Sequence, residues 1–319
     1  MWNRIRIMFA FVVPVILLLV SASGPMAAGK PHAPTYTIID LGTLGGASSY
    51  AQGINARGQV VGGSATTAGG FHAFLWEAGT GMQDLGTLGR DFSIASGINA
   101  QGQVVGYFTA ADFSNHAFLW EAGTGMQDLG TLGGRGSVAY GINARGQVVG
   151  YSATAAGQSH AFLWEAGTGM QDLGTLGGVF SVAYGINARG QVVGYGDTHP
   201  SGPFHAFLWE AGTGMQDLGT LGGESVARGI NARGQVVGGS FTSTSTSELH
   251  AFLWEAGTGM QDLGTLGDSE IRESDAFGIN ARGQVVGYST TAPDGFGGNI
   301  DIRPRTLHAT LWEPAEEVK

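Results

Sequence analysis

The sequence predicts an all-β fold made of six similar four-stranded units, and three observations support this prediction. An eighteen-residue string, HAFLWEAGTGMQDLGTLG, occurs five times without change. A second string, GINARGQVVG, occurs six times with a single substitution, Gln101. Short β-prone runs alternate with glycine-containing turns, and no segment keeps a 3.6-residue apolar period over three turns. Repeats of this kind stack into one long or closed body rather than into separate domains.

Each unit contains four predicted strands, which the third copy illustrates. The first, 137–143, is rich in small and apolar residues and ends in an NARG turn. The second, 147–152, holds β-branched and aromatic residues. A variable loop leads to the third strand, 160–165, and an EAGTG turn leads to the fourth, 170–176. Both faces of the third strand are apolar, so we expect every sheet to be buried between two neighbours.

The two ends of the repeat region complement each other. The region begins with the second half of a unit, YTIIDLGTLGG at 36–46, and ends with the first half of one, HATLWE at 308–313. If the N-terminal strand pairs with the last three strands, six four-stranded blades form a ring without an open sheet edge. An open solenoid would need distinct caps at both ends. We therefore predict a six-bladed β-propeller that is closed by its N-terminal strand.

The N-terminal segment predicts export. Arg4 and Arg6 precede an apolar run, 7–20, which is shorter than the roughly 20 residues of a membrane span. Small residues then offer cleavage after Gly24 or after Ala28, with an uncleaved anchor as the alternative. The predicted organisation is a signal peptide at 1–28, a linker at 29–34, one propeller at 35–313 and a tail at 314–319. We expect a secreted protein, periplasmic or extracellular, with no stable membrane insertion once the signal is removed.

Composition narrows the classes of partner. The formal charge is −10, only 13% of residues are charged, and Lys and Arg form no cluster. This pattern argues against nucleic acid as a partner. There is no Cys, so disulfides and thiolate chemistry are excluded. We expect a monomer without a cofactor, whose ligand is an extracellular or envelope glycan or protein.

The repeat units HAFLWEAGTGMQDLGTLGG and GINARGQVVGYS resemble the HAF-family repeat of bacterial proteins described as extracellular. The resemblance covers roughly residues 36–313 and rests on the His-Ala-Phe triplet. It implies export and a propeller-like β fold, and it implies no reaction. Some members carry a sorting or anchoring tail. This chain ends in EPAEEVK, which has no hydrophobic tail, so that feature does not transfer.

Two residue types stand at the same place in every unit and invite a functional interpretation. Six histidines begin the third strands, where a ring of imidazoles would bind metal or an anion: His72, His116, His160, His205, His250 and His308. We prefer a histidine in each blade that is hydrogen-bonded to the repeated Asp or Asn. Six tryptophans suggest a sugar-stacking platform, but we expect them to fill the core between blades: Trp76, Trp120, Trp164, Trp209, Trp254 and Trp312. A single active site needs asymmetry, which such residues do not provide.

The loops after the second and fourth strands differ between units, whereas the other two turns hardly change. Turns alternate between the ends of a meander, so the variable loops share one face of the ring, the usual place for binding. The last unit carries the largest insertions, and one of them holds Asp268, Glu270, Arg272, Glu273 and Asp275. The candidate ligand-binding residues are Asp197, His199, Asp294, Asn299, Asp301, Arg303 and Arg305. Oxygen ligands on the glycine-rich loop near residues 294–301 would suit Ca²⁺, but their spacing fits no known Ca²⁺ loop, and we prefer a solvated loop without metal.

These observations favour a noncatalytic binding or interaction module that uses the variable-loop face. No nucleophile elbow, P-loop, HExxH or Cys/His metal spacing is present, so no catalytic residue is assigned. Two alternatives remain. One is a polysaccharide-directed hydrolase or lyase with its site on the same face, and the other is a structural surface or matrix protein.

Overall fold

The computed structural model describes residues 37–244, 248–266, 273–291 and 307–314, and within these ranges the chain is all-β. No helix in the described ranges is long and apolar enough to cross a membrane. The expected signal peptide and the last residues of the tail lie outside the described residues.

Six antiparallel sheets follow one another along the chain, five with four strands and the sixth with three among the described residues. The first two sheets contain β1 (Gly45–Ile54), β2 (Val60–Thr66), β3 (Phe71–Glu77), β4 (Gly81–Asp84), β5 (Ser93–Ile98), β6 (Val104–Thr109), β7 (Asn115–Glu121) and β8 (Gly125–Asp128). The third and fourth contain β9 (Gly133–Ile142), β10 (Val148–Thr154), β11 (Ser159–Glu165), β12 (Gly169–Asp172), β13 (Ser181–Ile186), β14 (Val192–Asp197), β15 (Phe204–Glu210) and β16 (Gly214–Asp217). The last two contain β17 (Ser225–Ile230), β18 (Val236–Phe241), β19 (Leu249–Glu255), β20 (Gly259–Asp262), β21 (Ser274–Ile279), β22 (Val285–Thr290) and β23 (Leu307–Trp312).

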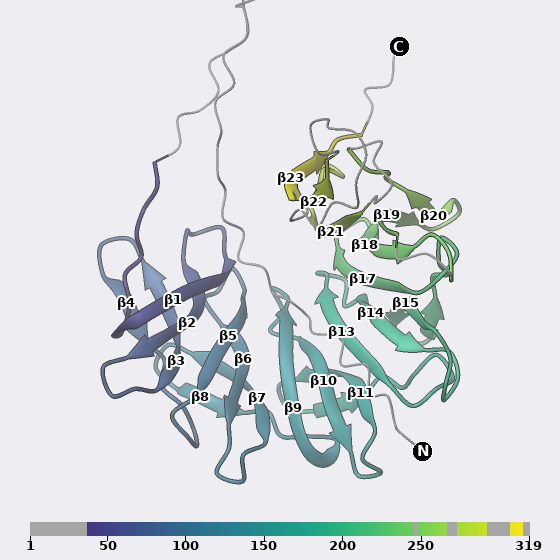
Figure 1. Ribbon diagram of the computed structural model, residues 1–319. Helices are drawn as coiled ribbons and strands as arrows, with labels where there is room; N and C mark the ends of the chain where they lie inside the picture. Colours follow the sequence, from purple (N-terminus) through teal and green to yellow (C-terminus); the bar gives the residue numbers. More distant parts are fainter. Residues whose placement is uncertain (1–36, 245–247, 267–272, 292–306, 315–319) are drawn as a thin grey trace, which may run out of the picture.

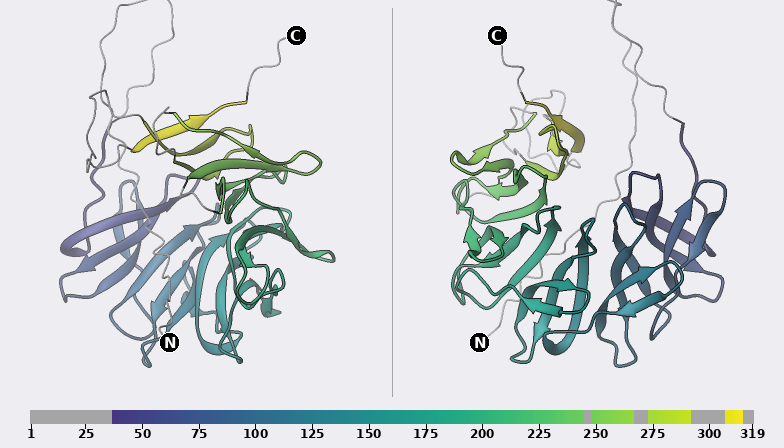
Figure 2. Two further views of the ribbon diagram at one scale, coloured as in Figure 1. Left: turned by 45° about the vertical axis from the view of Figure 1, so that its right-hand side comes forward. Right: turned by 180° about the vertical axis from the view of Figure 1, so that it is seen from behind.

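The sheets are arranged side by side in an arc (Figures 1 and 2). First strands of consecutive sheets contact each other, and the third strand of one sheet contacts the first strand of the next. Each sheet is a simple meander, so its two constant turns lie at one end and its two variable loops at the other. The predicted separation into a constant-turn face and a variable-loop face follows from this connectivity.

An apolar core fills the space between every pair of consecutive sheets. Between the third and fourth sheets, Val149 and Leu163 pack against Val192, Phe207 and Trp209, all at most 7% exposed. Equivalent residues form the same kind of core at the other four junctions. Both faces of an inner sheet are therefore buried, as the apolar pattern predicts.

Polar side chains also tie neighbouring sheets together. The Nδ2 of Asn143 donates to the carbonyl oxygen of Asn187 in the next sheet at 3.0 Å, and the same bond recurs at all five junctions. The hydroxyl of Ser181 accepts the backbone N–H of Ala161 from the preceding sheet at 2.8 Å and donates to the carbonyl of Gly174 at 2.6 Å. These bonds satisfy buried backbone groups that the strand pairing leaves over.

The two ends of the arc expose the apolar faces that are buried elsewhere. Val286 and Leu311 on the sixth sheet are 51% and 54% exposed, and Ile54 on the first is 69% exposed. Among the described residues, appreciable contacts join consecutive sheets and none joins the first to the sixth. Residues 37–40, the predicted closing strand, lie outside any strand. The six-sheet architecture is confirmed, whereas closure of the ring is not shown and stays a prediction.

The fourth strand is shorter than predicted. In the third sheet it ends at Asp172 instead of continuing to Leu176. The Oδ1 of Asp172 accepts the N–H of Gly174 at 2.8 Å, and Gly174 has φ of +77°. This side-chain turn leads the chain away from β11.

Candidate functional site

One residue in every first strand is left out of the strand pairing. In β9, Ala139 pairs with Gly150 and Gly141 pairs with Val149, so Tyr140 forms a β-bulge. Bulges redirect a side chain and often occur beside functional sites. The flanking Ala and Gly recur in all six sheets, but the bulged residue varies. The bulged residues are Gln52, Ser96, Tyr140, Tyr184, Arg228 and Phe277.

Tyrosine side chains from the first and second strands form a continuous aromatic band through the middle sheets. The ring centroids of Tyr140 and Tyr184 are 5.1 Å apart, and those of Tyr184 and Tyr195 are 5.9 Å apart. Tyr151 packs on Tyr140 at 6.1 Å. Burial raises the pKa of all four phenols, and the hydroxyls of Tyr184 and Tyr195 are hydrogen-bonded. Burial raises the pKa of Tyr107, further along the band, to about 12.

A buried ion pair interrupts this band between the fifth and sixth sheets. The Nε and Nη2 of Arg228 lie 2.9 Å and 2.7 Å from the Oδ2 of Asp275, whose side chain is 3% exposed. Burial raises the pKa of the Asp275 carboxyl, and Arg228 opposes that shift. Burial lowers the pKa of Arg228, but Asp275 outweighs it and the net pKa is raised. In the fourth sheet the same two positions hold Tyr184 and Val182.

A cavity of about 50 Å³ lies beside this ion pair, between the fourth and fifth sheets. Its lining includes Tyr195, Phe204, Phe241, Leu249 and Arg228. Phe204, Phe241 and Leu249 stand at strand ends next to variable loops, so the cavity belongs to the variable-loop face.

The cavity depends on Gly239 in β18 of the fifth sheet, which is equivalent to Tyr195 in β14 of the fourth sheet. A Cβ at Gly239 would lie 2.7 Å from the Oδ1 of Asp275 and 3.1 Å from the Cδ1 of Leu249. Any larger residue would therefore displace the carboxylate or fill the cavity.

A second irregularity on the variable-loop face is an exposed aromatic side chain. Phe113 is 71% exposed and has φ of +68°, a backbone conformation that costs energy for a residue with a side chain. The guanidinium carbon of Arg90, from the loop after β4, lies 3.3 Å from the centre of the Phe113 ring. Two variable loops therefore present a stacked cation and aromatic ring to solvent.

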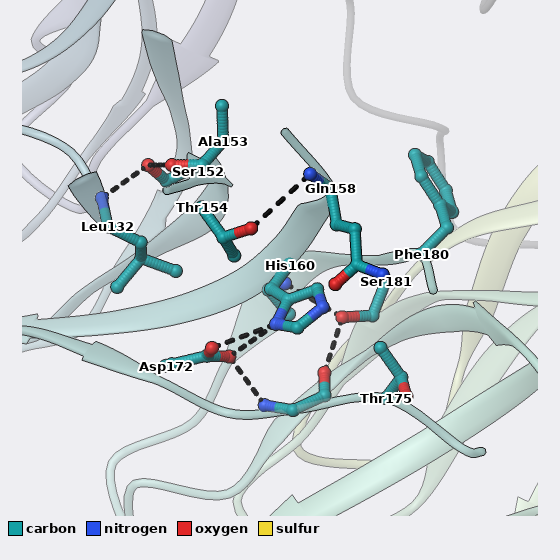
Figure 3. A network of polar contacts seen from close by, with 12 residues as sticks. Leu132, Ser152, Ala153, Thr154, Gln158, His160, Asp172, Thr175, Phe180 and Ser181 are labelled. Atoms are coloured by element: carbon teal, nitrogen blue, oxygen red, sulfur yellow. Dashed lines mark hydrogen bonds and ion pairs between the residues drawn. The ribbon is translucent and has the colours of Figure 1, made fainter. Parts of the chain in front are cut away.

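The repeated histidines form structural pairs, as we preferred on the sequence alone. The Nδ1 of His160 lies 2.8 Å from the Oδ2 of Asp172 in the neighbouring strand (Figure 3). The same His–Asp pair occurs in the first five sheets. His308 in β23 is exposed, and its counterpart for such a pair is Asp40, at the other end of the arc. Within the described ranges no three His, Asp or Glu side chains are placed to hold a metal ion.

The tryptophans fill the cores between sheets. Trp120, Trp164, Trp209 and Trp254 are 6–7% exposed. At the open end of the arc, the Nε1 of Trp312 donates to the carbonyl oxygen of Leu263 at 3.0 Å. The core assignment is therefore confirmed for the inner sheets.

Two of the predicted ligand-binding residues are described. Asp197 is a buried residue of β14, and its carboxylate accepts the N–H groups of Val179 and Phe180 at 3.0 Å and 2.8 Å. These bonds give Asp197 a structural role in holding the preceding loop. His199 is exposed in the next turn. The candidates Asp294, Asn299, Asp301, Arg303 and Arg305 lie outside the described residues, so their role stays a prediction.

Sequence reasoning missed the ion pair. It placed Asp275 in a loop of the last unit, but this residue lies in β21, because it pairs with Tyr288 in the strand ladder. The signal that would have found it is positional. In the third and fourth units the position of Arg228 holds Tyr and the position of Asp275 holds Val. The two replacements introduce opposite charges in consecutive units.

The ion pair predicts a specific pattern of stabilities. Asp275→Val leaves the Arg228 charge buried without its partner, and we expect a loss of about 3–5 kcal/mol in the free energy of unfolding. Arg228→Tyr combined with Asp275→Val recreates the residue types of the fourth sheet and is expected to recover most of that loss. Urea unfolding of these two variants and of Arg228→Tyr alone measures the coupling. A loss in the double variant equal to the sum of the two single losses would show that the pair is not coupled.

The buried phenols predict a decline of stability at alkaline pH. Because the folded pKa of Tyr107 is about 12 and the ordinary value is 10.0, the folded state keeps this proton after the unfolded chain has lost it. The contribution is complete below pH 10 and is lost as the pH rises through about 12. We expect Tyr107→Phe to flatten the decline in urea-unfolding free energy over this window. An identical decline in the variant would argue against the assignment.

No family model matches the chain, and no curated protein matches its sequence. The chain is similar to the β-propeller domain of the Trilobed protease from Pyrococcus furiosus, with a TM-score of 0.54, 13% identity and coverage of 83% of this chain and 80% of that one. TolB from Acinetobacter baumannii matches 73% of this chain with a TM-score of 0.46 and 11% identity, and the chain spans 60% of its length.

A third match is the lectin of Aleuria aurantia, described as a six-bladed β-propeller with a novel fucose recognition mode. It has a TM-score of 0.34 and 11% identity, over 83% of this chain and 97% of that one. Only the Pyrococcus furiosus domain has a TM-score above 0.5 among these three, so only that likeness contributes to the assignment. At 13% identity it supports the fold alone. The chain has the β-propeller architecture of six consecutive sheets.

Proposed function

We propose that this protein is a secreted, noncatalytic binding module that holds an extracellular or envelope protein on its variable-loop face. The observation that carries the proposal is the break in the repeat on that face. The cavity beside Arg228 and the exposed ring of Phe113 both occur where the otherwise repeated frame changes. Aromatic residues and arginine are the side chains that protein interfaces favour most, which is why a protein ligand fits this surface.

The size and lining of the cavity support the same class of ligand. Its volume of about 50 Å³ is too small for a drug-sized molecule, whose sites occupy about 300–1,000 Å³. Its aromatic walls suit one apolar side chain that projects from a partner surface. Arg228 is part of the lining, and the N–H groups of its side chain that Asp275 does not use are donors for a carbonyl group of the partner.

The proposal includes closure of the ring, because closure would bring the variable loops of the first and sixth sheets next to each other on this face. The segment before β1 already has the local structure of the other fourth-strand ends. The Oδ1 of Asp40 accepts the N–H of Gly42 at 2.9 Å, and the Ser49 hydroxyl donates to the carbonyl of Gly42 at 2.6 Å. Pairing of residues 37–40 with β23 would add the sixth His–Asp pair, between His308 and Asp40.

Burial of apolar surface favours this closure. Ile38 and Ile39 are 95% and 64% exposed, at the positions of Met82 and Gln83 in the first sheet. Leu311 and Val286 face solvent where their counterparts contact the next sheet. Each apolar side chain removed from water contributes about 1.5–3 kcal/mol, so several of them outweigh the cost of ordering a short strand.

A disulfide cross-link tests closure, because the chain contains no cysteine of its own. In the first sheet Leu75 pairs with Gln83, and the corresponding pair across the gap is Leu311 with Ile39. We expect Ile39→Cys combined with Leu311→Cys to form an intramolecular disulfide, which mass spectrometry of the tryptic peptides detects. Leu75→Cys with Gln83→Cys serves as the positive control.

The alternatives give different products. The Pyrococcus furiosus domain is described as having an open velcro topology. Free thiols at 39 and 311, with the control pair oxidised, would mean that this ring is open as well. A disulfide-linked dimer would mean that the strand is exchanged between two chains. Either result contradicts closure within one chain.

Site-specific photocrosslinking tests the binding face. A benzoylphenylalanine at position 113 replaces one exposed aromatic residue by another, and we expect it to capture one partner protein from the envelope fraction of the source cell. The matched control is the same group at Thr168, in a constant turn of the third sheet. Adducts of equal yield at both positions, or none at 113, would contradict the proposed face.

A further inference from the structure

A groove on the constant-turn face takes no part in the proposed function. It has a volume of about 540 Å³ and lies between the third and fourth sheets. Its lining combines charged, amide and aromatic side chains, among them Arg145, Glu165, Arg189, Glu210 and Trp209. All of these belong to the repeated strings, so repetition places the same residue types at the other junctions, except that Gln101 replaces the arginine in the second sheet.

The charged groups of the groove are not paired with one another. In the part of the chain that the structure describes, no carboxylate lies within ion-pair distance of Arg145 or Arg189. The Oε1 of Glu165 accepts a hydrogen bond from Gln147, and the Oε1 of Glu210 accepts one from Gln191. Each carboxylate keeps a second oxygen that accepts no side-chain bond from another described residue.

The guanidinium of Arg145 reaches toward the next sheet. Its Nη2 would lie 2.8 Å from a Cβ built on Gly190, in the following NARG turn. Arg57 reaches Gly102 in the same way, at 2.7 Å. These arginines therefore lie across the junction between two sheets, and the glycine that the turn requires also leaves them room.

The mixture of groups selects a neutral ligand that both donates and accepts hydrogen bonds. The two arginines and the two glutamates balance in charge, so the groove as a whole favours neither an anion nor a cation. Neighbouring hydroxyl groups of a sugar donate to a carboxylate and accept from a guanidinium at once. Trp209 and Leu163, which are 7% and 6% exposed, are the apolar residues of this lining that the C–H face of a sugar ring would contact.

We propose that the junctions between sheets on the constant-turn face are repeated subsites for a neutral polysaccharide. A ligand with repeating units is the kind that identical sites bind together, because each further contact becomes intramolecular. The subsites lie on the opposite face from the proposed protein site. The protein would then join a neutral glycan to a protein partner.

The chain contains its own comparison at Gln101, which replaces the arginine in the second sheet. Because Arg145 and Arg189 both line one junction, the equivalence of the units predicts that position 101 borders the junctions on both sides of the second sheet. The backbone N–H of Gln101 donates to the Oδ1 of Asn99, just as the N–H of Arg145 donates to the Oδ1 of Asn143. Glutamine is therefore structurally tolerated at this position, and exchanging the two residue types changes the groove without changing the turn.

The test uses two variants of the mature chain. One carries glutamine in place of five arginines, at Arg57, Arg145, Arg189, Arg233 and Arg282, and the other is Gln101→Arg. Affinity electrophoresis measures retention in gels that contain dextran, pullulan, mannan or galactan, with dextran sulfate as the anionic comparison. We expect the natural chain to be retained by at least one neutral polymer. We expect the five-site variant to bind that polymer about tenfold or more weakly and Gln101→Arg to bind it more tightly.

Unchanged thermal unfolding of both variants establishes that retention reports the groove. The proposal is overturned if no neutral polymer retains the natural chain, if the five-site variant is retained equally, or if dextran sulfate alone is bound. Photocrosslinking at position 113 is read separately in the five-site variant. A preserved adduct with lost retention places the two activities on different faces, and lost retention together with a lost adduct would contradict that separation.

Discussion

The structure depends on the contact between one face of a sheet and the opposite face of the next. No inner sheet has a polar side. In the third sheet, for example, Val149 is buried against the fourth sheet and Phe162 against the second. A single sheet would therefore leave two apolar surfaces in water. Two hydrogen bonds fix the separation of the sheets. One runs from each Asn side chain to the carbonyl of the next Asn, and the other runs from a third strand to the serine of the following first strand. Stability thus accumulates with each junction, as in other repeat proteins.

This dependence explains which residues are free to differ. Side chains that form the junctions recur in every unit, because the same two surfaces meet each time. Residues outside the junction cores vary, namely the loops at one end and the bulged position on the inner strand. The Arg228–Asp275 pair is the largest such departure among the described strands, since it buries two charges where the third and fourth sheets have tyrosine and valine. Asp275 is an exception, because it stands in the strand ladder at a position that holds a buried valine in the third and fourth sheets.

Much of the fold could be predicted from periodicity and spacing. The strands, the two apolar faces, the pairing of histidine with aspartate and the core position of tryptophan all follow from residues that repeat. The β-bulge could not be predicted, because a skipped residue leaves the sequence pattern of the strand intact. The ion pair was missed because its members are 47 residues apart and Asp275 interrupts an apolar strand, so it resembled part of a loop. Closure depends on two surfaces that only a full ring brings together, and no local pattern decides whether they meet.

The bulge has a consequence for how such a protein changes its properties. A residue that takes no part in the strand ladder contributes little to the register, so replacing it leaves the pairing of the sheet intact. Tyr140 and Arg228 occupy this place in different sheets, and both sheets have the same register. Each sheet thereby has one bulged position whose side chain can change independently of those in the other sheets. The six bulged residues together set the chemistry of the inner strands, and they can change without any change in the fold.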